Sequence, residues 1–173
     1  AIETASELGW LDDEWTIETT ALAQLCAGVF ACGSIQSDVF RPSWTPTTEV
    51  GRSEIEDSLT AVGVGRRVEH TNRSVEYWPG DHSSVLGRAL VAAGSPIGDK
   101  TQETVDSIPQ WLDEAPVSIR ASFVQLSVAE RAIDYDQKAT KRIQTDRSFS
   151  YFQQTSDLIE SVTGESVTYS ESG

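Results

Sequence analysis

The side chains best suited to catalysis or metal binding are few and widely spaced in this chain. His70 and His82 are its two histidines, and no further ligand stands near either at HxxxH or CxxC spacing. A structural zinc ion takes four nitrogen or sulfur ligands, so we expect no metal site. A catalytic pocket would have to gather His70, Glu76, Asp81 and His82 around one predicted hairpin. That enzyme hypothesis stays open, but the favoured prediction is a protein with no enzymatic activity and no cofactor.

The paired cysteines and paired aspartates favour structural roles. On a helix the α-carbons of Cys26 and Cys32 would lie about 9 Å apart, which is beyond disulfide reach. We interpret both as small apolar core residues, assembled in a reducing compartment. Asp134 and Asp136 would point away from each other on a helix, so they cannot share a metal ion, and Asp134 would instead pair with Lys138.

The distribution of charge is the most informative feature of the sequence. The 173 residues include 27 acidic and 13 basic side chains, for a formal net charge of −14. Residues 1–40 contain no Lys or Arg, and no basic residue follows Arg147. This balance argues against general affinity for nucleic acid. Acid-rich, lysine-poor surfaces suit concentrated salt, so we interpret the chain as a halophile's protein, with an ordinary acidic mesophilic domain as the alternative.

An uncharged run at residues 19–37 positions the first main element. It predicts a helix over about residues 18–34, with Thr16 as the N-cap. The run is too polar for a transmembrane span, so we expect no membrane contact. Its apolar residues share one helical face, which indicates a core helix: Ala21, Leu22, Leu25, Val29 and Cys32.

Turn and capping signals divide the middle of the chain into short elements. After a loop at 37–52, they predict a helix opened by the Ser53–Glu56 capping box and ended by Gly63. A hairpin over 64–78 follows, with its turn at 71–73. A helix capped by Asp81 or Ser83 would run to Gly94, and a short helix would lie around 102–114.

The longest predicted element is a helix over about residues 117–146. At about 100° per residue, its apolar residues form two nearly opposite stripes: Ile119, Phe123, Leu126, Ala129 and Ile133, and Ala121, Val128, Ala132, Tyr135, Ala139 and Ile143. Four bases project between the stripes, within about 40° of one another: Arg120, Arg131, Lys138 and Arg142. A helix with two apolar sides must be covered on both, which predicts a neighbouring subunit on one of them.

The basic stripe allows three interpretations. It is a solvated face with local ion pairs, a contact for the base-free N-terminal third of an adjacent copy, or a surface that touches DNA. Contact between different parts of identical chains favours a head-to-tail ring. The predicted subunit interface consists of the four bases with Val128 and Tyr135.

Two segments late in the chain carry a resemblance to a known family. Residues 116–121 (PVSIRA) open the predicted long helix, and residues 147–152 (RSFSYF) follow it. They resemble the helical head–tail adaptor (connector) proteins of tailed viruses, in which a proline precedes an Ile-Arg/Lys-x-Ala-like helix start and a polar segment with aromatic residues comes next. The early uncharged helix and the middle hairpin are similar in order to that family. The chain departs from it in a long insert between Phe40 and Ile108 and in an acidic tail.

The resemblance implies a subunit of a twelve-fold ring beneath the portal protein, in contact with tail or neck proteins and with passing contact to packaged DNA. It implies a location in the virion neck after assembly in the host cytoplasm, and the composition adds a halophilic archaeal host. The C-terminal segment would meet the portal through Phe149, Tyr151, Phe152, Leu158, Ile159, Val167 and Tyr169.

The predicted fold is mainly α: a helical bundle around one long C-terminal helix, with a small β-hairpin and irregular insertion and an extended C-terminal tail. The predicted units are residues 1–147, with the insertion at about 37–108, and a docking tail at 148–173. Two alternatives to the adaptor stay open: another neck or tail completion protein of the virion, and a small halophilic cytosolic helical regulatory domain.

Overall fold

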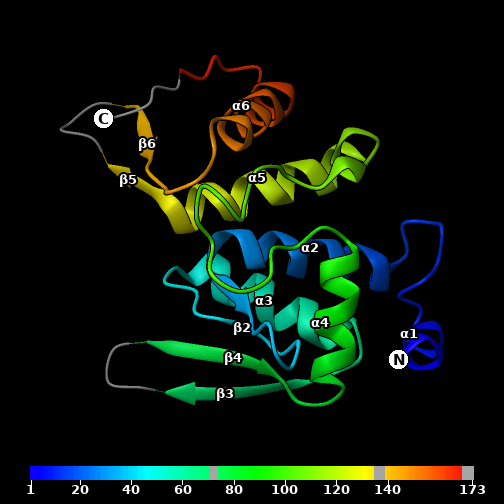
Figure 1. The fold of residues 1–173 in the computed structure, drawn as a ribbon. Helices are drawn as coiled ribbons and strands as arrows, with labels where there is room; N and C mark the ends of the chain where they lie inside the picture. Colours follow the sequence, from blue (N-terminus) through cyan, green and yellow to red (C-terminus); the bar gives the residue numbers. More distant parts are fainter. Residues whose placement is uncertain (71–73, 135–138, 169–173) are drawn as a thin grey trace.

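Helices and an antiparallel sheet are stacked in layers, with the sheet below the central helices in Figure 1. The computed structural model describes residues 1–70, 74–134 and 139–168. Within them the chain forms six α-helices, one 3-10 helix, a four-stranded antiparallel sheet and a separate two-stranded sheet. The predicted helical bundle around one long C-terminal helix was therefore wrong, because the chain mixes helices with sheet, and its longest described helices have 15 residues.

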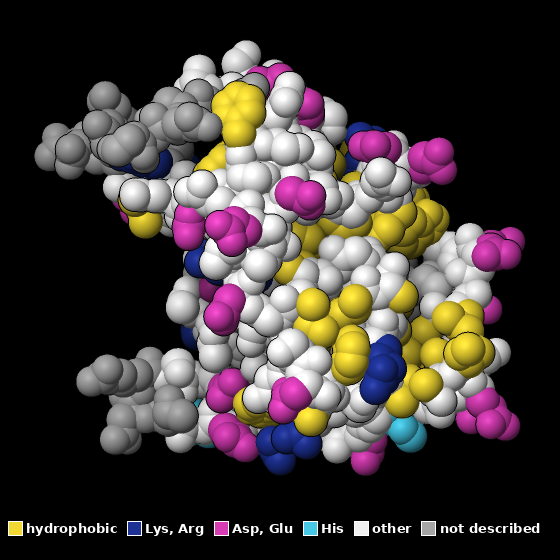
Figure 2. Space-filling model, in the orientation of Figure 1, with side chains coloured by type: hydrophobic (Ala, Val, Ile, Leu, Met, Phe, Trp, Pro, Cys, Tyr) yellow, Lys and Arg dark blue, Asp and Glu magenta, His cyan; other side chains and the backbone are white. Residues whose placement is uncertain are grey.

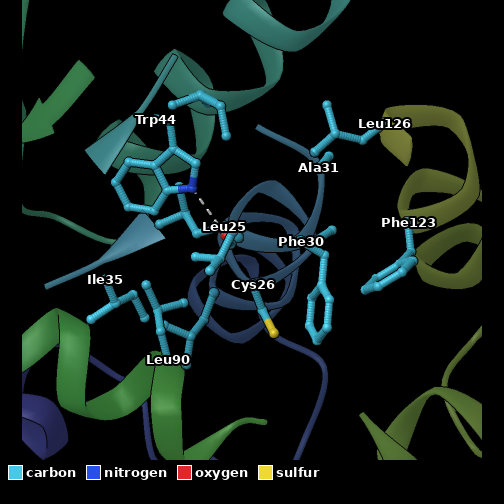
Figure 3. Packing of buried hydrophobic residues seen from close by; sticks show 14 of the residues in the cluster. Leu25, Cys26, Phe30, Ala31, Ile35, Trp44, Leu90, Phe123 and Leu126 are labelled. Atoms are coloured by element: carbon cyan, nitrogen blue, oxygen red, sulfur yellow. Dashed lines mark hydrogen bonds between the residues drawn. The ribbon is translucent and has the colours of Figure 1, made fainter. Parts of the chain in front are cut away.

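Helix α2 (Ile17–Ala31) occupies the centre of the fold. Thr16 caps its N-terminus through a reciprocal pair of hydrogen bonds with Thr19, which confirms the predicted cap. Residues 25–31 are all buried, so the helix is covered on every side and not on the one face that periodicity predicted. Figure 3 shows side chains from three other parts of the chain packed around it, including Ile35, Trp44, Leu90, Phe123 and Leu126.

The four-stranded sheet follows α2 and covers one side of it. Its strands, in the spatial order β1-β2-β4-β3, are Gly33–Ile35, Pro42–Trp44, Val75–Pro79 and Arg66–His70. The antiparallel pairing of β3 with β4 confirms the predicted hairpin, whose turn at 71–73 lies outside the described residues. Trp44 is fully buried, and its Nε1 donates a hydrogen bond to the Leu25 carbonyl oxygen at 3.3 Å. This contact joins the sheet to α2.

Helix α3 (Glu49–Ala61) packs against α2 and starts earlier than predicted. Its N-cap is Thr48, whose hydroxyl accepts a hydrogen bond from the Gly51 amide. The predicted capping box at Ser53 therefore lies inside the helix. The N-terminal helix α1 (Ile2–Glu7) precedes Trp10, and the buried Trp10 Nε1 donates to the carbonyl of Val62 at 3.0 Å.

Helix α4 (Ser83–Ala92) lies beside the sheet and begins within two residues of the predicted start, but its N-cap is His82 and neither Asp81 nor Ser83. His82 precedes it in the left-handed conformation, and Gly94 follows it with φ of +97°. The helix predicted at 102–114 was wrong in extent, because this segment contains one short 3-10 helix, η1 (Gln110–Asp113).

Helix α5 (Val117–Arg131) begins directly after Pro116, as predicted, but ends about fifteen residues early. Ala132 adopts an extended conformation with ψ of 136°, and strands β5 (Ala132–Asp134) and β6 (Lys141–Ile143) form a hairpin. Asp134 forms an ion pair with Lys141 on the opposite strand, and its predicted partner Lys138 lies outside the described residues. The prediction of one helix over 117–146 was wrong, because cross-strand pairing replaced helical pairing.

The C-terminal part is also packed and not an extended tail. Helix α6 (Phe149–Thr163) starts at the Ser148 cap, ends at Gly164, and lies against α5 (Figure 1). Tyr151 is buried and stacks on Phe30 of α2, with 6.2 Å between ring centroids.

The close approach of α4 to the loop before β2 predicts a sensitive position. A Cβ at Gly87 would overlap the carbonyl oxygen of Phe40. We expect Gly87→Ala to lower the free energy of unfolding by about 3 kcal/mol, because backbone cannot move aside as a flexible side chain can. Denaturant unfolding measures this, with Ser84→Ala on the exposed side of α4 as the control, expected within about 0.5 kcal/mol of the parent. Equal stability of the two variants would contradict the tight contact.

Candidate functional site

A cleft of about 330 Å³ opens where the sheet meets the end of α5. Strands β1, β2 and β4 contribute polar side chains to it, and Lys100, Glu130 and Arg131 complete its wall. The two hairpins, β3–β4 and β5–β6, project from the same side of the molecule (Figure 1). Figure 2 shows some Lys and Arg side chains on this side, between the two grey segments, together with Asp and Glu side chains.

Lys100 holds the C-terminal end of α2. Its Nζ donates hydrogen bonds to the carbonyl oxygens of Val29, at 2.6 Å, and of Gly33. These carbonyls carry the partial negative charge of the helix end, which attracts a cation. Burial, followed by the nearby positive charges of Arg131 and Arg147, lowers the pKa of Lys100 to about 8. The ammonium therefore uses two of its three protons in the wall of the cleft.

Three cations meet here without a carboxylate partner. Arg147 is 7% exposed, and its Nη1 donates to the carbonyl oxygens of Lys100, at 2.5 Å, and of Asp146, at 2.6 Å. Arg131 is half-buried and lines the cleft. Among the described residues, none of Lys100, Arg131 and Arg147 forms an ion pair with an acid. Burial lowers the pKa of Arg147 as well.

Glu130 is an acid in the wall of the cleft, and its carboxylate is hydrogen-bonded to Thr47 and Thr48. Its Oε2 accepts from the amide and hydroxyl of Thr47, at 2.8 and 2.9 Å, and its Oε1 accepts from those of Thr48, at 3.1 and 2.5 Å. Burial alone would raise the pKa of Glu130, but these four hydrogen bonds outweigh it and hold the pKa below the ordinary value. The carboxylate thus joins the end of α5 to the start of α3.

A second concave surface lies on the other side of the molecule. An apolar groove of about 310 Å³ is lined by the start of α2 and by α3, including Trp15, Ile17, Ala21 and Asp57. Ile17 is 74% exposed. Directly before the groove, the exposed segment 11–14 carries one leucine and three acids. In Figure 2 acidic and hydrophobic side chains occupy this side, opposite the hairpins.

Cys32 lines the cleft and Cys26 is buried in the core, and both are poor nucleophiles. Burial raises the pKa of Cys26 and of Cys32 to about 12. Both are free thiols, and the thiolate required for attack is therefore scarce at neutral pH.

The predicted basic stripe does not lie along one helix. Arg120 and Arg131 belong to α5, while Arg142 is exposed on β6. Lys138 and Tyr135 lie outside the described residues. The proposed interface is therefore distributed over at least two elements, with Arg131 in the cleft wall.

Arg120 and Val128, both assigned to that predicted interface, make contacts inside the chain. Arg120 donates from Nε to the Ala115 carbonyl at 3.2 Å and from Nη1 to the Ser161 hydroxyl at 3.3 Å. It therefore links α5 to α6. Val128 packs partly buried against the main core.

The residues predicted to dock on the portal differ in accessibility. Tyr151 and Leu158 are buried in the chain's own core. Phe152, Ile159 and Val167 are half-buried, and Phe149 is 50% exposed. Tyr169 lies outside the described residues.

The four residues of the enzyme hypothesis do not converge. His70 and Glu76 lie on adjacent strands but on opposite faces of the sheet, because His70 pairs with Val75. Asp81 and His82 follow the far end of β4 and are exposed. The described residues contain no group of three or more His, Cys, Asp or Glu side chains placed to hold a metal ion. Among the same residues, no helix is both long and apolar enough to cross a membrane.

The cleft was not predicted, although one signal pointed to it. Lys100 is one of three lysines in a lysine-poor chain and stands far from the other two. Its partners are backbone carbonyls about seventy residues earlier, which no local pattern predicts.

No protein-family model matches the chain, and no curated protein matches it.

The Glu130 contacts predict a pH-dependent contribution to stability. We expect Glu130→Gln to lower the free energy of unfolding by about 2 kcal/mol at neutral pH, because an amide nitrogen faces donors that need an acceptor. The pKa of Glu130 in the folded protein lies below its ordinary value of 4.5. The carboxylate's contribution to the free energy of unfolding is therefore present above about pH 4.5 and is lost as the pH falls through the lower, folded pKa.

Denaturant titrations between about pH 7 and pH 3 test this dependence. The difference between parent and Glu130→Gln should shrink toward acid pH. Gln125→Ala, on the exposed side of α5, serves as the control and should give a constant difference. A Glu130→Gln difference that does not change with pH would contradict the assignment.

Proposed function

We propose that this chain is a structural subunit that assembles head to tail into a closed ring. The observation that carries the proposal is the placement of two unlike surfaces on opposite sides of one molecule. The basic edge comprises the β5–β6 hairpin and the cleft, with Ile133, Arg131 and Arg142. The acidic edge comprises residues 11–14 and the apolar groove behind them. Unlike patches on opposite sides produce a heterologous contact, which closes into a ring when the rotation allows.

The hairpin suits the groove in both polarity and charge. Ile133 is 50% exposed on β5, and Arg142 pairs with it in the register and is exposed on β6. The groove presents Trp15 and Ile17 to an apolar residue, with Asp57 in its wall. In molar salt the Debye length falls to about 3 Å, so charge sets orientation at contact while apolar burial supplies affinity.

The specific form that we propose is a head–tail adaptor in the neck of a tailed virus of a halophilic archaeon, beneath the portal. Support comes from the resemblance at 116–121 and 147–152, where a helix starts after Pro116 and an aromatic helix start follows. The accessible part of the predicted portal surface is Phe149, with Phe152, Ile159 and Val167 partly accessible. Twelve-fold symmetry and assembly in the host cytoplasm belong to this proposal.

Two exposed isoleucines allow a direct test of head-to-tail assembly. We expect the parent to form particles larger than a dimer in molar KCl, measured by size-exclusion chromatography with light scattering. Ile133→Asp should block the hairpin and Ile17→Asp should block the groove, because each places a carboxylate in an apolar contact without touching the core. Each variant alone should remain monomeric.

Mixing the two variants separates a head-to-tail contact from other arrangements. One intact hairpin and one intact groove remain in the mixture, so a heterodimer should form and grow no further. Val39→Asp, at an exposed valine of the loop before β2, is the control and should assemble like the parent. A parent that stays monomeric at high concentration, or variants that assemble normally, would refute the proposed ring. If the ring forms, co-purification with a portal protein would distinguish a head–tail adaptor from another neck protein.

A further inference from the structure

We propose that the cleft at the end of α2 is an anion-binding site that takes a phosphate, sulfate or carboxylate group. The proposal concerns the cavity itself and stands whether or not the chain forms a ring. Its donors are the third proton of the Lys100 ammonium, the Arg131 guanidinium and two serine hydroxyls. Arg147 adds a buried positive charge behind them.

The strongest argument is the gathering of three cations that lack a salt-bridge partner, although Glu76 and Glu130 also line the cleft. The chain has about two acids for each base, yet Lys100, Arg131 and Arg147 are gathered together and form no ion pair with a described acid. After burial, the charges of Arg131 and Arg147 lower the pKa of Lys100, and the charge of Arg131 lowers the pKa of Arg147, as repulsion between neighbouring cations requires. Buried charges are normally paired. An anion in the cleft would provide the missing partner.

The wall also contains donors that no other contact uses. The Arg131 side chain makes no hydrogen bond to a described residue, although Arg131 lines the cavity. Ser34 and Ser43 face each other in the register of β1 and β2, and both line the cavity without a side-chain hydrogen bond to the described chain. A guanidinium, an ammonium and hydroxyl groups together form a donor set suited to an oxyanion. The volume of about 330 Å³ lies at the lower end of the range of small-molecule sites, about 300–1,000 Å³.

The acids in the wall limit the ligand without filling the site. The oxygens of Glu130 accept four hydrogen bonds from Thr47 and Thr48, so this carboxylate is held away from the cations. Glu76 of β4 is half-buried and also lines the cleft. Its negative charge would repel an anion, so its removal should strengthen binding.

Two sources of the anionic group are distinguishable by experiment. One is a free oxyanion or small acidic molecule, and the other is a carboxylate of segment 7–14 from a second copy. The probes are therefore inorganic phosphate, sulfate, acetate and a synthetic peptide with the sequence of residues 7–14. Each is titrated at constant ionic strength, with potassium chloride as the replacement salt, because screening alone changes the stability of an acidic protein.

Binding is measured by titration calorimetry and by the shift of the thermal unfolding midpoint. We expect saturable binding of at least one probe by the parent. Arg131→Gln should weaken it by about tenfold or more, because a charge-assisted hydrogen bond is lost, and Glu76→Gln should strengthen it. Arg88→Gln is the matched control, since it removes an exposed arginine of α4 outside the cleft wall and should bind like the parent.

Each outcome decides the proposal. Phosphate, sulfate or acetate binding that depends on Arg131 supports a site for a free anion, and peptide binding with the same dependence assigns the carboxylate to a second copy. The proposal is overturned if no probe binds, or if binding is unchanged in both Arg131→Gln and Glu76→Gln. In either of those cases Lys100 would serve only to hold the end of α2.

Discussion

The central constraint on this fold is the complete burial of helix α2. A helix that is apolar on every side must be covered on every side, and each neighbouring element covers part of it. The sheet covers it through Trp44, α5 through Phe123 and α6 through Tyr151. Since the end of such a helix leaves carbonyl groups without helical partners, burial also demands a donor there. Lys100 supplies that donor, and the polar cleft follows from its position.

The two candidate surfaces share a physical origin in this arrangement. The cleft forms at the C-terminal end of α2, where a cation is favoured, and the apolar groove forms at its N-terminal end, beside acidic residues. The direction of α2 therefore places the cleft with its cations at one end of the helix and the groove with its neighbouring acids at the other. Charge segregation along the sequence becomes segregation in space, because residues 1–16 lead into the N-terminal end and Lys100 and Arg131 gather at the other.

Local signals in the sequence predicted the elements that local chemistry controls. Thr16 as a cap, the β3–β4 pairing and the start of α5 after Pro116 all depend on neighbouring residues. The end of α5 was missed because the helical period continues past Arg131 with no Gly or Pro. Asp134 has a basic partner both four residues later, as in a helix, and at Lys141, as in a hairpin. Tertiary context decided between them.

The missed parts of the candidate site depend on contacts between distant segments. Glu130 binds Thr47 and Thr48 more than eighty residues away. Strands β1 and β2 have three residues each, too few for alternation to be recognised. Buried cations are rare enough that a sequence-based prediction places lysine and arginine on the surface. Arg131 was therefore assigned to a surface stripe, facing solvent, a neighbouring subunit or DNA, and not to a cluster with Lys100 and Arg147.

Residue 100 belongs to two contact networks at once. Its side chain faces the end of α2 and the cleft, while its carbonyl accepts a hydrogen bond from Arg147, directly before α6. The adjoining loop also holds α6, since the Ile108 amide donates to Gln154 and the Ser148 hydroxyl donates to Asp106. A displacement of this single backbone position would therefore move both the wall of the cleft and the start of the last helix.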